Sequence, residues 1–316
     1  MPQTSRETHT HPPTAAAGSP QPRGRAAHCP EGRFVGRFAT TGTVYLVGAG
    51  PGATDLITVR GLRILQSADV VLHDALISPE MLLEAAPDAE VVSVGKRGYC
   101  VGSTRQEHIN EAMVRYARMG KSVCRLKCGD PCVFGRGGEE AEMLVHAGVP
   151  FQIVPGVTSA VGVCAAAGIP LTHRDAGQAV ALVTGHHDPD SSDCTLDWNS
   201  LARMPAVVFY MAVRHVTKIA ARLSSSGLSP DTPVAVIESG TLIRQRVHVA
   251  TLGTIGVVTE CAAVTGPAVF VVGEIVRFRD KLMALASGGL ESAVPLVNEN
   301  RGLAPTARRK SQGVST

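Results

Sequence analysis

The chain has 316 residues, of which 30 are basic and 27 acidic, so its formal net charge is +3. Hydrophobic residues make up 44% of it, which is too many for a wholly disordered protein. No apolar run reaches the roughly 18 residues that a membrane-spanning helix needs. We therefore expect a globular protein that does not cross a membrane and lacks the basic face of a nucleic-acid-binding protein.

The two ends of the chain differ in composition from its body. Residues 1–41 are proline-rich and carry a net charge of +3, and residues 285–316 carry +2, which leaves −2 for residues 42–284. Neither end has the periodicity of a helix or strand, so we predict disordered extensions at 1–41 and 285–316. The arginine-rich, acid-poor start would also suit an organelle-targeting peptide. The simpler expectation is a cytoplasmic protein whose eight scattered cysteines stay reduced.

The first half of the body alternates β-rich runs with helical ones. Thr54 is a possible N-cap of the first helix, and Ser78 with Pro79 at the first helical position begins the second. This alternation predicts a parallel α/β sheet whose ligand lies at the carboxyl ends of its strands. The predicted strands are 43–48, 69–74, 90–95, 122–127 and 150–156, and the helices cover 54–68, a segment from 78 on, 108–119 and 137–148.

The second half has a different pattern. The predicted strands are 179–185, 206–211, 234–239, 245–252 and 268–276, with a helix around 214–223. No long helix is expected between the last three strands, which indicates a mixed sheet. We predict two α/β domains, 42–175 and 176–284, with the ligand site in the cleft between them.

Three strand ends of the first half carry residues of interest. The turn "VGAGPG" at 47–52 allows close approach of a ligand to its backbone, but it lacks the glycine spacing of a dinucleotide site. Asp74 ends the second predicted strand, where it is either a site residue or the cap of a turn. Lys96 and Arg97 follow the third strand and either meet an anionic substrate or lie in a solvated loop.

The segment 125–140, "RLKCGDPCVFGRGGEE", places charged residues among glycines directly after a strand. This pattern favours a loop that wraps a ligand over a plain surface loop. The spacing of Cys124, Cys128 and Cys132 differs by one residue from that of a radical-enzyme iron–sulfur site, so small apolar side chains in a tight loop are the favoured interpretation. His186 and His187 lack a metal-binding partner at a familiar spacing, and we expect loop histidines there.

Taken in order, several segments resemble the tetrapyrrole methylase family, and the resemblance covers about residues 43–283. It implies two α/β domains, a homodimer, and S-adenosylmethionine as methyl donor, with no metal. Within the family, "GRGGEE" favours members that methylate uroporphyrinogen III at C2 and C7 to give precorrin-2. The segments are "VYLVGAGPG", "LISPE", "VGKR", "GDPCVFGRGGEE", "VPGVTSA", "GIPLTHR" and "FYM".

The resemblance also assigns roles to individual residues. Asp74 and Lys96 match the proposed proton acceptor and donor, and Arg136 matches a catalytic residue that also binds substrate with Glu139 and Arg174. Arginine stays protonated, so Arg136 is expected to orient substrate or stabilise charge. The expected cofactor-binding residues are Pro51, Cys128, Gly129, Asp130, Val133, Thr158, Ser159, Met211, Gly240 and Ala268.

The sequence departs from the family at two positions of the cofactor loop, where Cys128 stands for the usual Gly and Cys132 for the common Phe. A side chain at 128 fits only if its φ is negative and the side chain points away from the cofactor. The alternatives are another precorrin methyltransferase and, from a different class, a non-catalytic cofactor-binding regulator. Neither tail is long enough for the dehydrogenase–chelatase domain of a bifunctional sirohaem synthase, so we expect none in this chain.

Overall fold

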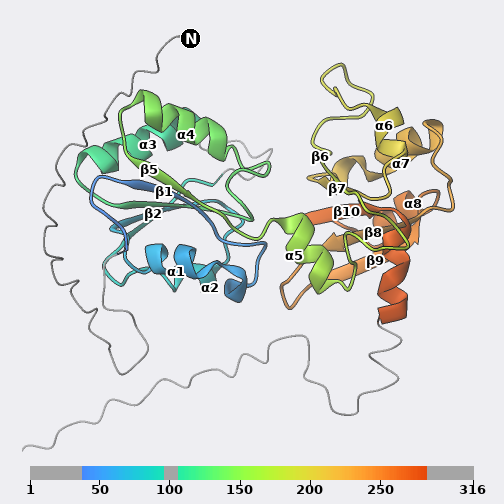
Figure 1. Cartoon of the computed structure of the whole chain (residues 1–316), viewed down its shortest axis with the longest axis horizontal. Coiled ribbons are helices and arrows are strands. Elements are labelled where there is room, and N and C mark those ends of the chain that lie inside the picture. The colour runs from blue at the N-terminus through green and yellow to red at the C-terminus, as the bar shows by residue number, and fades with distance from the viewer. Residues whose placement is uncertain (1–37, 96–105, 283–316) are drawn as a thin grey trace, which may run out of the picture. The chain divides into compact units, whose positions relative to one another are not determined.

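A computed structural model describes residues 38–95 and 106–282 of the protein (Figure 1). The predicted extensions, apart from residues 38–41, lie outside the described residues, as does Lys96. The described chain forms two five-stranded sheets, the first from residues 44–154 and the second from residues 181–272. None of the described helices is both long enough and apolar enough to cross a membrane.

The first sheet is entirely parallel, as the alternating pattern predicts. Its strand order is β3-β2-β4-β1-β5, so β1 lies between β4 and β5. Each of the predicted strands is found within a residue or two of its expected bounds. The strands are β1 (Val44–Gly48), β2 (Val70–His73), β3 (Glu90–Ser93), β4 (Val123–Lys127) and β5 (Phe151–Val154).

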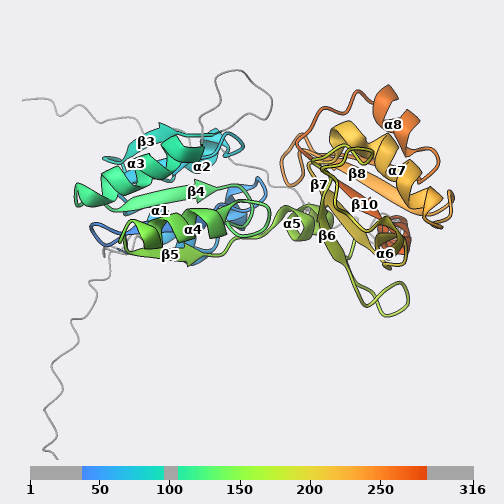
Figure 2. The same cartoon turned by 90° about the horizontal axis from the view of Figure 1, so that it is seen from above.

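Helices cover both faces of this sheet (Figure 2). Alternate strand residues point to opposite sides, so Tyr45 and Val47 pack against Leu65 while Val44 and Leu46 belong to the other cluster. Two separate hydrophobic clusters result, one on each face. The helices are α1 (Val59–Leu65) and α2 (Pro79–Leu82) on one face and α3 (Gln106–Arg118) and α4 (Gly137–His146) on the other.

The helix starts test the capping predictions. Ser78 caps α2 by accepting a hydrogen bond from the Met81 N–H at 3.2 Å, with Pro79 at the first helical position, which confirms that prediction. The prediction for Thr54 is wrong. A 3₁₀ turn, Thr54–Leu56, is followed by the extended residue Ile57, and Thr58 caps α1 by accepting from the Gly61 N–H at 3.1 Å.

The second sheet is mixed, as predicted. Its order is β6-β7-β10-β8-β9, in which only β6 and β7 are parallel neighbours. The short helices α6 and α8 were not predicted, and the β-branched residues of α8 explain why its segment does not resemble a helix. The elements are β6 (Ala181–Thr184), α6 (Trp198–Ala202), β7 (Val207–Tyr210), α7 (Val216–Ser225), β8 (Pro233–Glu238), β9 (Arg246–Thr251), α8 (Ile255–Cys261) and β10 (Ala268–Val272).

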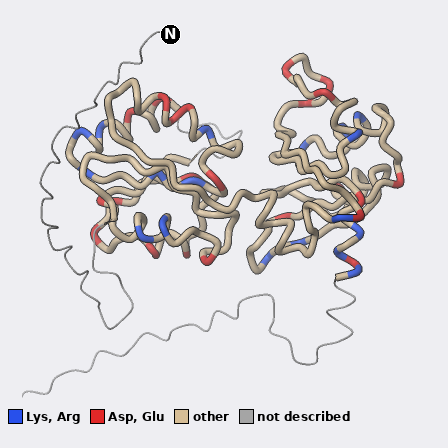
Figure 3. The backbone as a smooth tube through the Cα atoms, in the orientation of Figure 1, with Lys and Arg blue, Asp and Glu red and all other residues tan. Residues whose placement is uncertain are grey.

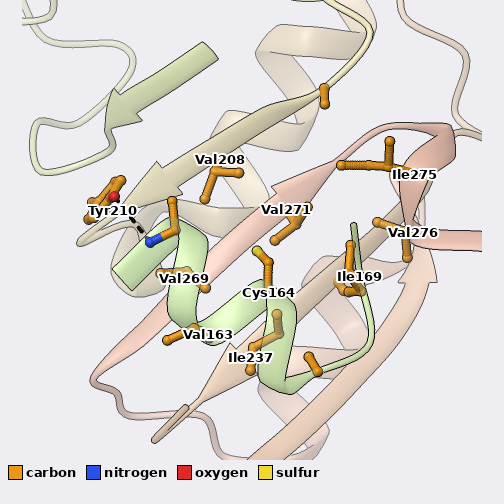
Figure 4. Packing of buried hydrophobic residues seen from close by; sticks show 14 residues of the cluster. Val163, Cys164, Ile169, Val208, Tyr210, Ile237, Val269, Val271, Ile275 and Val276 are labelled. Carbon is orange, nitrogen blue, oxygen red and sulfur yellow. Dashed lines mark hydrogen bonds between the residues drawn. The ribbon is translucent and has the colours of Figure 1, made fainter. Parts of the chain in front are cut away.

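Helix α5 (Ser159–Ala166) follows the first sheet in the chain but packs on the second (Figure 4). Its Val163 and Cys164 lie in one cluster with Val208 and Ile237 of the second sheet. The opposite face of that sheet is covered by α7 and α8. The chain therefore connects the two sheets through a helix that is buried against the second one, upstream of the predicted boundary at 175/176.

Candidate functional site

Three turns at the carboxyl ends of β1, β4 and β5 meet backbone to backbone. The Gly129 N–H donates to the Gly50 carbonyl at 2.7 Å, and the Gly50 N–H donates back to Gly129 at 3.2 Å. A Cβ on Gly48 would lie 2.6 Å from the Gly129 oxygen, and one on Gly156 would lie 2.2 Å from it. Only glycine permits this approach, so the motifs at 47–52, 128–133 and 154–160 form one junction.

Asp130 ties two of these turns together. Its Oδ2 accepts from the Gly156 N–H at 3.0 Å, and its Oδ1 accepts from the Cys132 N–H at 2.8 Å. Both carboxylate oxygens therefore hold backbone groups of the junction. The side chain fixes the shape of the loop that was expected to bind the cofactor, and a cofactor contact of Asp130 stays a prediction.

Cys128 meets the first condition set by its departure from the family. It is not among the described non-glycine residues with positive φ, and it packs against the hydrophobic cluster that contains Cys124. Burial raises the pKa of the Cys128 thiol to about 11 and that of Cys124 to about 12. Both thiols are therefore protonated at neutral pH, as expected of small side chains that fill a tight, buried loop.

Tyr210, at the end of β7, connects the start of α5 to the second sheet (Figure 4). The Ala160 N–H donates to its hydroxyl at 3.1 Å, and the hydroxyl shares a 2.7 Å hydrogen bond with Thr158 Oγ1. Thr158 makes no capping bond of its own, so Tyr210 satisfies a free N–H of the first helical turn. The ring of Phe134 packs on Tyr210 with centroids 4.9 Å apart. Neither Tyr210 nor Phe134 is among the site residues expected from the sequence.

Further contacts join the first glycine turn to the second half of the chain. The Ala53 N–H donates to Thr241 Oγ1 at 3.0 Å. A Cβ on Gly162 would lie 2.7 Å from Cγ of Pro51, and one on Gly240 would lie 2.4 Å from Val163 Cγ1. Pro51 and Gly240 thus both lie against α5.

Strained backbone gathers around these loops. Of the six described non-glycine residues with positive φ, five lie in three short stretches, 134–136, 211 and 239–241. Such conformations cost of the order of 1–3 kcal/mol each and occur where the surroundings enforce them, often at ligand sites. They include the expected site residues Arg136 and Met211, the latter half-exposed. The five are Phe134, Arg136, Met211, Ser239 and Thr241.

The remaining expected cofactor residues lie along the same loops. Val133 is partly buried against the cluster of α5 and the second sheet, and Ser159 begins α5. A Cβ on Gly129 would lie 3.6 Å from the Ser159 N. Ala268 begins β10 and is partly buried.

Asp74, directly after β2, is part of a buried group of ions. Arg125 Nη2 of β4 lies 2.5 Å from Asp74 Oδ1, and Arg125 Nε lies 3.2 Å from Glu140 Oε1 of α4. Lys127 Nζ lies 3.0 Å from Glu140 Oε2. We call Asp74, Arg125, Lys127 and Glu140 the ion cluster. Arg125 is not among the expected site residues, because its position inside a strand resembles a core position and not a strand end.

Burial governs the electrostatics of the cluster. Side-chain exposure is 29% for Asp74 but at most 3% for the other three. Desolvation lowers the pKa of Lys127, with Arg125 adding to this effect and Glu140 opposing it. Desolvation also acts to lower the pKa of Arg125, but Asp74 and Glu140 outweigh it and the pKa rises. Asp74 is therefore the exposed end of a chain of otherwise buried charges.

The expected substrate-binding residues are exposed. Arg136 Nε lies 3.7 Å from Glu139 Oε2, and both side chains are more than half exposed. Arg174 lies in a tight turn closed by hydrogen bonds between His173 and Gly177. Arg136 and Arg174 therefore stand on separate loops, and their joint role in binding substrate stays a prediction. Lys96 lies outside the described residues.

A metal-binding arrangement is absent from residues 38–95 and 106–282. No group of three or more His, Cys, Asp or Glu side chains there is arranged to hold a metal ion. The rings of His186 and His187 pack edge to face, 5.2 Å apart, in the loop before α6.

Comparison with known families gives a match over residues 43–256 to the Tetrapyrrole (Corrin/Porphyrin) Methylases. The siroheme synthase of Hydrogenovibrio crunogenus is 45% identical over 248 residues, which are 78% of this chain and 52% of that protein. The chain spans about half the length of the curated relatives it matches.

Two solved structures of related methyltransferases also match this chain, and the match covers nearly the whole length of each of them. A uroporphyrin-III C-methyltransferase from Thermus thermophilus in complex with S-adenosyl homocysteine is 40% identical, with a TM-score of 0.63, covering 74% of this chain and 99% of that one. A cobalt precorrin-4 methyltransferase is 30% identical with a TM-score of 0.67, covering 74% and 96%.

Proposed function

Because the chain belongs to the tetrapyrrole methylase family, we propose that it is a uroporphyrinogen-III C-methyltransferase that uses S-adenosylmethionine. The products would be precorrin-1 and then precorrin-2, after methylation at C2 and C7, for siroheme or cobalamin synthesis. The observation that carries the proposal is the junction of three glycine turns with Asp74 at the neighbouring strand end. The structural relative in complex with S-adenosyl homocysteine supports the cofactor.

The residues of the junction fit such a cofactor. Gly48, Gly129 and Gly156 bring three backbones together without side chains between them, at the carboxyl ends of the strands where ligands of such sheets bind. The strained residues Met211 and Thr241 add backbone from the second half of the chain. In the proposal, the loops of Pro51, Cys128–Asp130, Val133, Thr158–Ser159, Met211, Gly240 and Ala268 hold the cofactor.

The cofactor supplies an electrophilic methyl group, and the protein must position a pyrrole carbon against it. Arg136 and Arg174 are proposed to bind carboxylates of the tetrapyrrole, each such charge-assisted bond being worth about 1.5–3 kcal/mol. Glu139, ion-paired with Arg136, is proposed to orient that arginine toward substrate. Correct alignment of the reacting atoms accounts for much of the barrier reduction in two-substrate enzymes.

The methylated ring must also lose a proton. Asp74 is proposed to accept it, because its carboxylate is partly exposed and is paired on its buried side with Arg125. Lys96 is proposed as the proton donor. General acid–base catalysis of this kind contributes about 10²–10⁴-fold to a rate.

The direct test is incubation with uroporphyrinogen III and S-adenosylmethionine under anaerobic conditions, followed by mass spectrometry. Two successive methyl additions are expected. Absence of methyl transfer in a chain that still binds S-adenosylhomocysteine would refute the activity.

The role split can be tested with Asp130→Ala and Arg174→Ala. The first should weaken S-adenosylhomocysteine binding, since it releases the Gly156 N–H and the Cys132 N–H, and the second should raise the KM for the tetrapyrrole. Equal losses of both affinities in both variants would count against the split.

The likeness to a cobalt precorrin-4 methyltransferase supports a second candidate, another precorrin methyltransferase on the same fold. Competition between uroporphyrinogen III and later corrin precursors separates the two. Faster methylation of a later precursor would favour the second candidate. A homodimer is also proposed, and sedimentation equilibrium tests it.

A further inference from the structure

The ion cluster contains three groups to which the proposed reaction gives no task. Arg125, Lys127 and Glu140 are almost completely buried, and only Asp74 reaches the surface at the strand ends. A fully buried ion pair is seldom the most stabilising choice, because removing charges from water is costly and apolar side chains of equal volume often do as well. The cluster therefore calls for an explanation other than packing.

Glu140 is the centre of this arrangement. Its Oε1 accepts from Arg125 Nε at 3.2 Å and from Gln106 Nε2 at 3.3 Å, and its Oε2 faces Lys127 Nζ at 3.0 Å. The Glu140 carboxylate thus forms ion pairs with both Arg125 and Lys127, which lie two residues apart on β4. It comes from α4, whose position is fixed by packing against the first sheet.

Arg125 transmits this arrangement to Asp74. While its Nε points to Glu140, its Nη2 donates to Asp74 Oδ1 at 2.5 Å and its Nη1 donates to the Leu72 carbonyl at 3.3 Å. The planar guanidinium is therefore held at both edges, and its remaining donors fix the Asp74 carboxylate at the end of β2.

We propose that Glu140 and Lys127 are positioning residues for Asp74, which act through Arg125 to hold its carboxylate in place and to set the charge around it. The inference rests on the proposed function only in that Asp74 takes the ring proton. The adjacent Glu139 differs from Glu140, since it is two-thirds exposed and pairs with Arg136.

The charges around Asp74 determine whether each substitution favours its ionised or its protonated form. The described groups coupled to Asp74 include Arg125 and Lys127 of β4 and the Cys128 thiol, and Glu140 pairs with Arg125 behind it. The His73 Nδ1 atom lies 3.0 Å from the Asp74 backbone carbonyl oxygen. Neutralising Glu140 makes these surroundings more positive and favours an ionised Asp74. Neutralising Lys127 makes them more negative and favours a protonated Asp74.

The test is a carbon-13 NMR titration of the Asp74 carboxyl in the substrate-free chain, assigned by loss of its signal in Asp74→Asn. Compared with the parent chain, its titration midpoint should move to lower pH in Glu140→Gln and to higher pH in Lys127→Met, by about half a pH unit or more. Glu142→Gln, an exposed glutamate on the same helix, is the control and should leave it in place.

The double variant Glu140→Gln/Lys127→Met keeps the charge balance and should titrate between the two single variants. It also carries the test if Glu140→Gln does not fold. Movement of both single variants in the same direction, or no movement in either, would overturn the inference. A double variant outside the range of the single variants would do the same.

Rates provide a second measurement that keeps the inference separate from the proposed function. In a chain that transfers methyl groups, Glu140→Gln should lower kcat by about 10–100-fold with an unchanged KM for S-adenosylmethionine. The acidic limb of its pH–rate profile should move in the same direction as the NMR midpoint. A chain without methyl transfer would refute the proposed function and still permit the titration.

Discussion

The two sheets contribute different kinds of group to the candidate site. The first presents ionised side chains, Asp74 with Arg125 behind it, at the carboxyl ends of parallel strands. The second presents mainly backbone and uncharged side chains, Tyr210 and the strained residues Met211 and Thr241. This difference suggests that proton transfer belongs to the first sheet alone, while loops of both sheets hold the cofactor. Substitutions in either sheet test that division.

The largest expected effect is loss of the central cation of the ion cluster. Arg125→Met leaves the buried Glu140 with only Lys127 and leaves the partly exposed Asp74 without its ion-pair partner, and breaking a buried ion pair costs about 3–5 kcal/mol. Denaturant unfolding measures this change in the free energy of unfolding. Arg60→Met, at an exposed position of α1, is the matched control. A decrease in the free energy of unfolding of less than half that size would show that the ion pairs of Arg125 contribute little to stability.

The second sheet has one buried carboxylate of its own at the end of β8. Glu238 Oε1 accepts from the Thr265 N–H at 3.1 Å and from the Gly266 N–H at 3.3 Å, and its Oε2 pairs with Arg246. Burial acts to raise the pKa of Glu238, but the two N–H groups and Arg246 outweigh it and the pKa falls below its ordinary 4.5.

Glu238 therefore stabilises the fold above pH 4.5, and this contribution is lost as the pH falls through the lower folded pKa. Glu238→Gln should cost about 1.5–3 kcal/mol at neutral pH and flatten that acid dependence. Denaturant midpoints between pH 3 and 7 measure both (roughly the range in which a carboxyl titrates). An acid dependence identical to that of the parent chain would contradict the assignment.

A smaller effect is expected at the hydroxyl of Tyr210. Tyr210→Phe leaves the Ala160 N–H and Thr158 without their partner, at a cost of about 1–2 kcal/mol, and should weaken S-adenosylhomocysteine binding about 3–10-fold. Calorimetry measures the affinity. Tyr45→Phe is the control in the first sheet, where the hydroxyl accepts from the Thr40 N–H at 2.9 Å, and it should change stability alone. Equal affinities in the two variants would argue against a separate role for the second sheet.

The smallest effect is expected at the surface of the second half. The loop before α6 is acidic and its aspartates meet basic residues of α7, with Lys218 Nζ 2.5 Å from Asp188 Oδ2 (Figure 3). Exposed ion pairs of this kind contribute little and are screened by salt. Lys218→Met should leave both the thermal midpoint and cofactor affinity unchanged. A clear decrease in the thermal midpoint or in cofactor affinity would mean that ion pairs of the second half contribute to stability or to cofactor binding as well.

Much of the first sheet could be predicted from sequence, because its strands are short, apolar and bounded by turns. Ser78 followed by Pro79 identifies a helix start on its own. The N-cap was predicted at Thr54 and not at Thr58, because both threonines precede the same apolar run. The structure distinguishes them by the extended backbone of Ile57, which ends the 3₁₀ turn of Thr54 before α1 begins.

The site was harder to predict, because a sequence motif does not show which of its charged side chains are buried in the fold. Glu139 and Glu140 are adjacent and identical in type, yet one is exposed and the other is the centre of the ion cluster. Arg125 occupies a core position of a strand, and its charge is explained only by two carboxylates from other elements, Asp74 after β2 and Glu140 of α4. The placement of α5 on the second sheet depends in the same way on tertiary packing.

The most direct test of the division between the sheets is single-turnover methyl transfer by Asp74→Asn, with cofactor affinity measured on the same sample. Asparagine keeps the shape of the side chain and removes its basicity. The account predicts unchanged S-adenosylhomocysteine affinity and a transfer rate lower by about 10²–10⁴-fold. A rate like that of the parent chain, or a parallel loss of affinity, would contradict it.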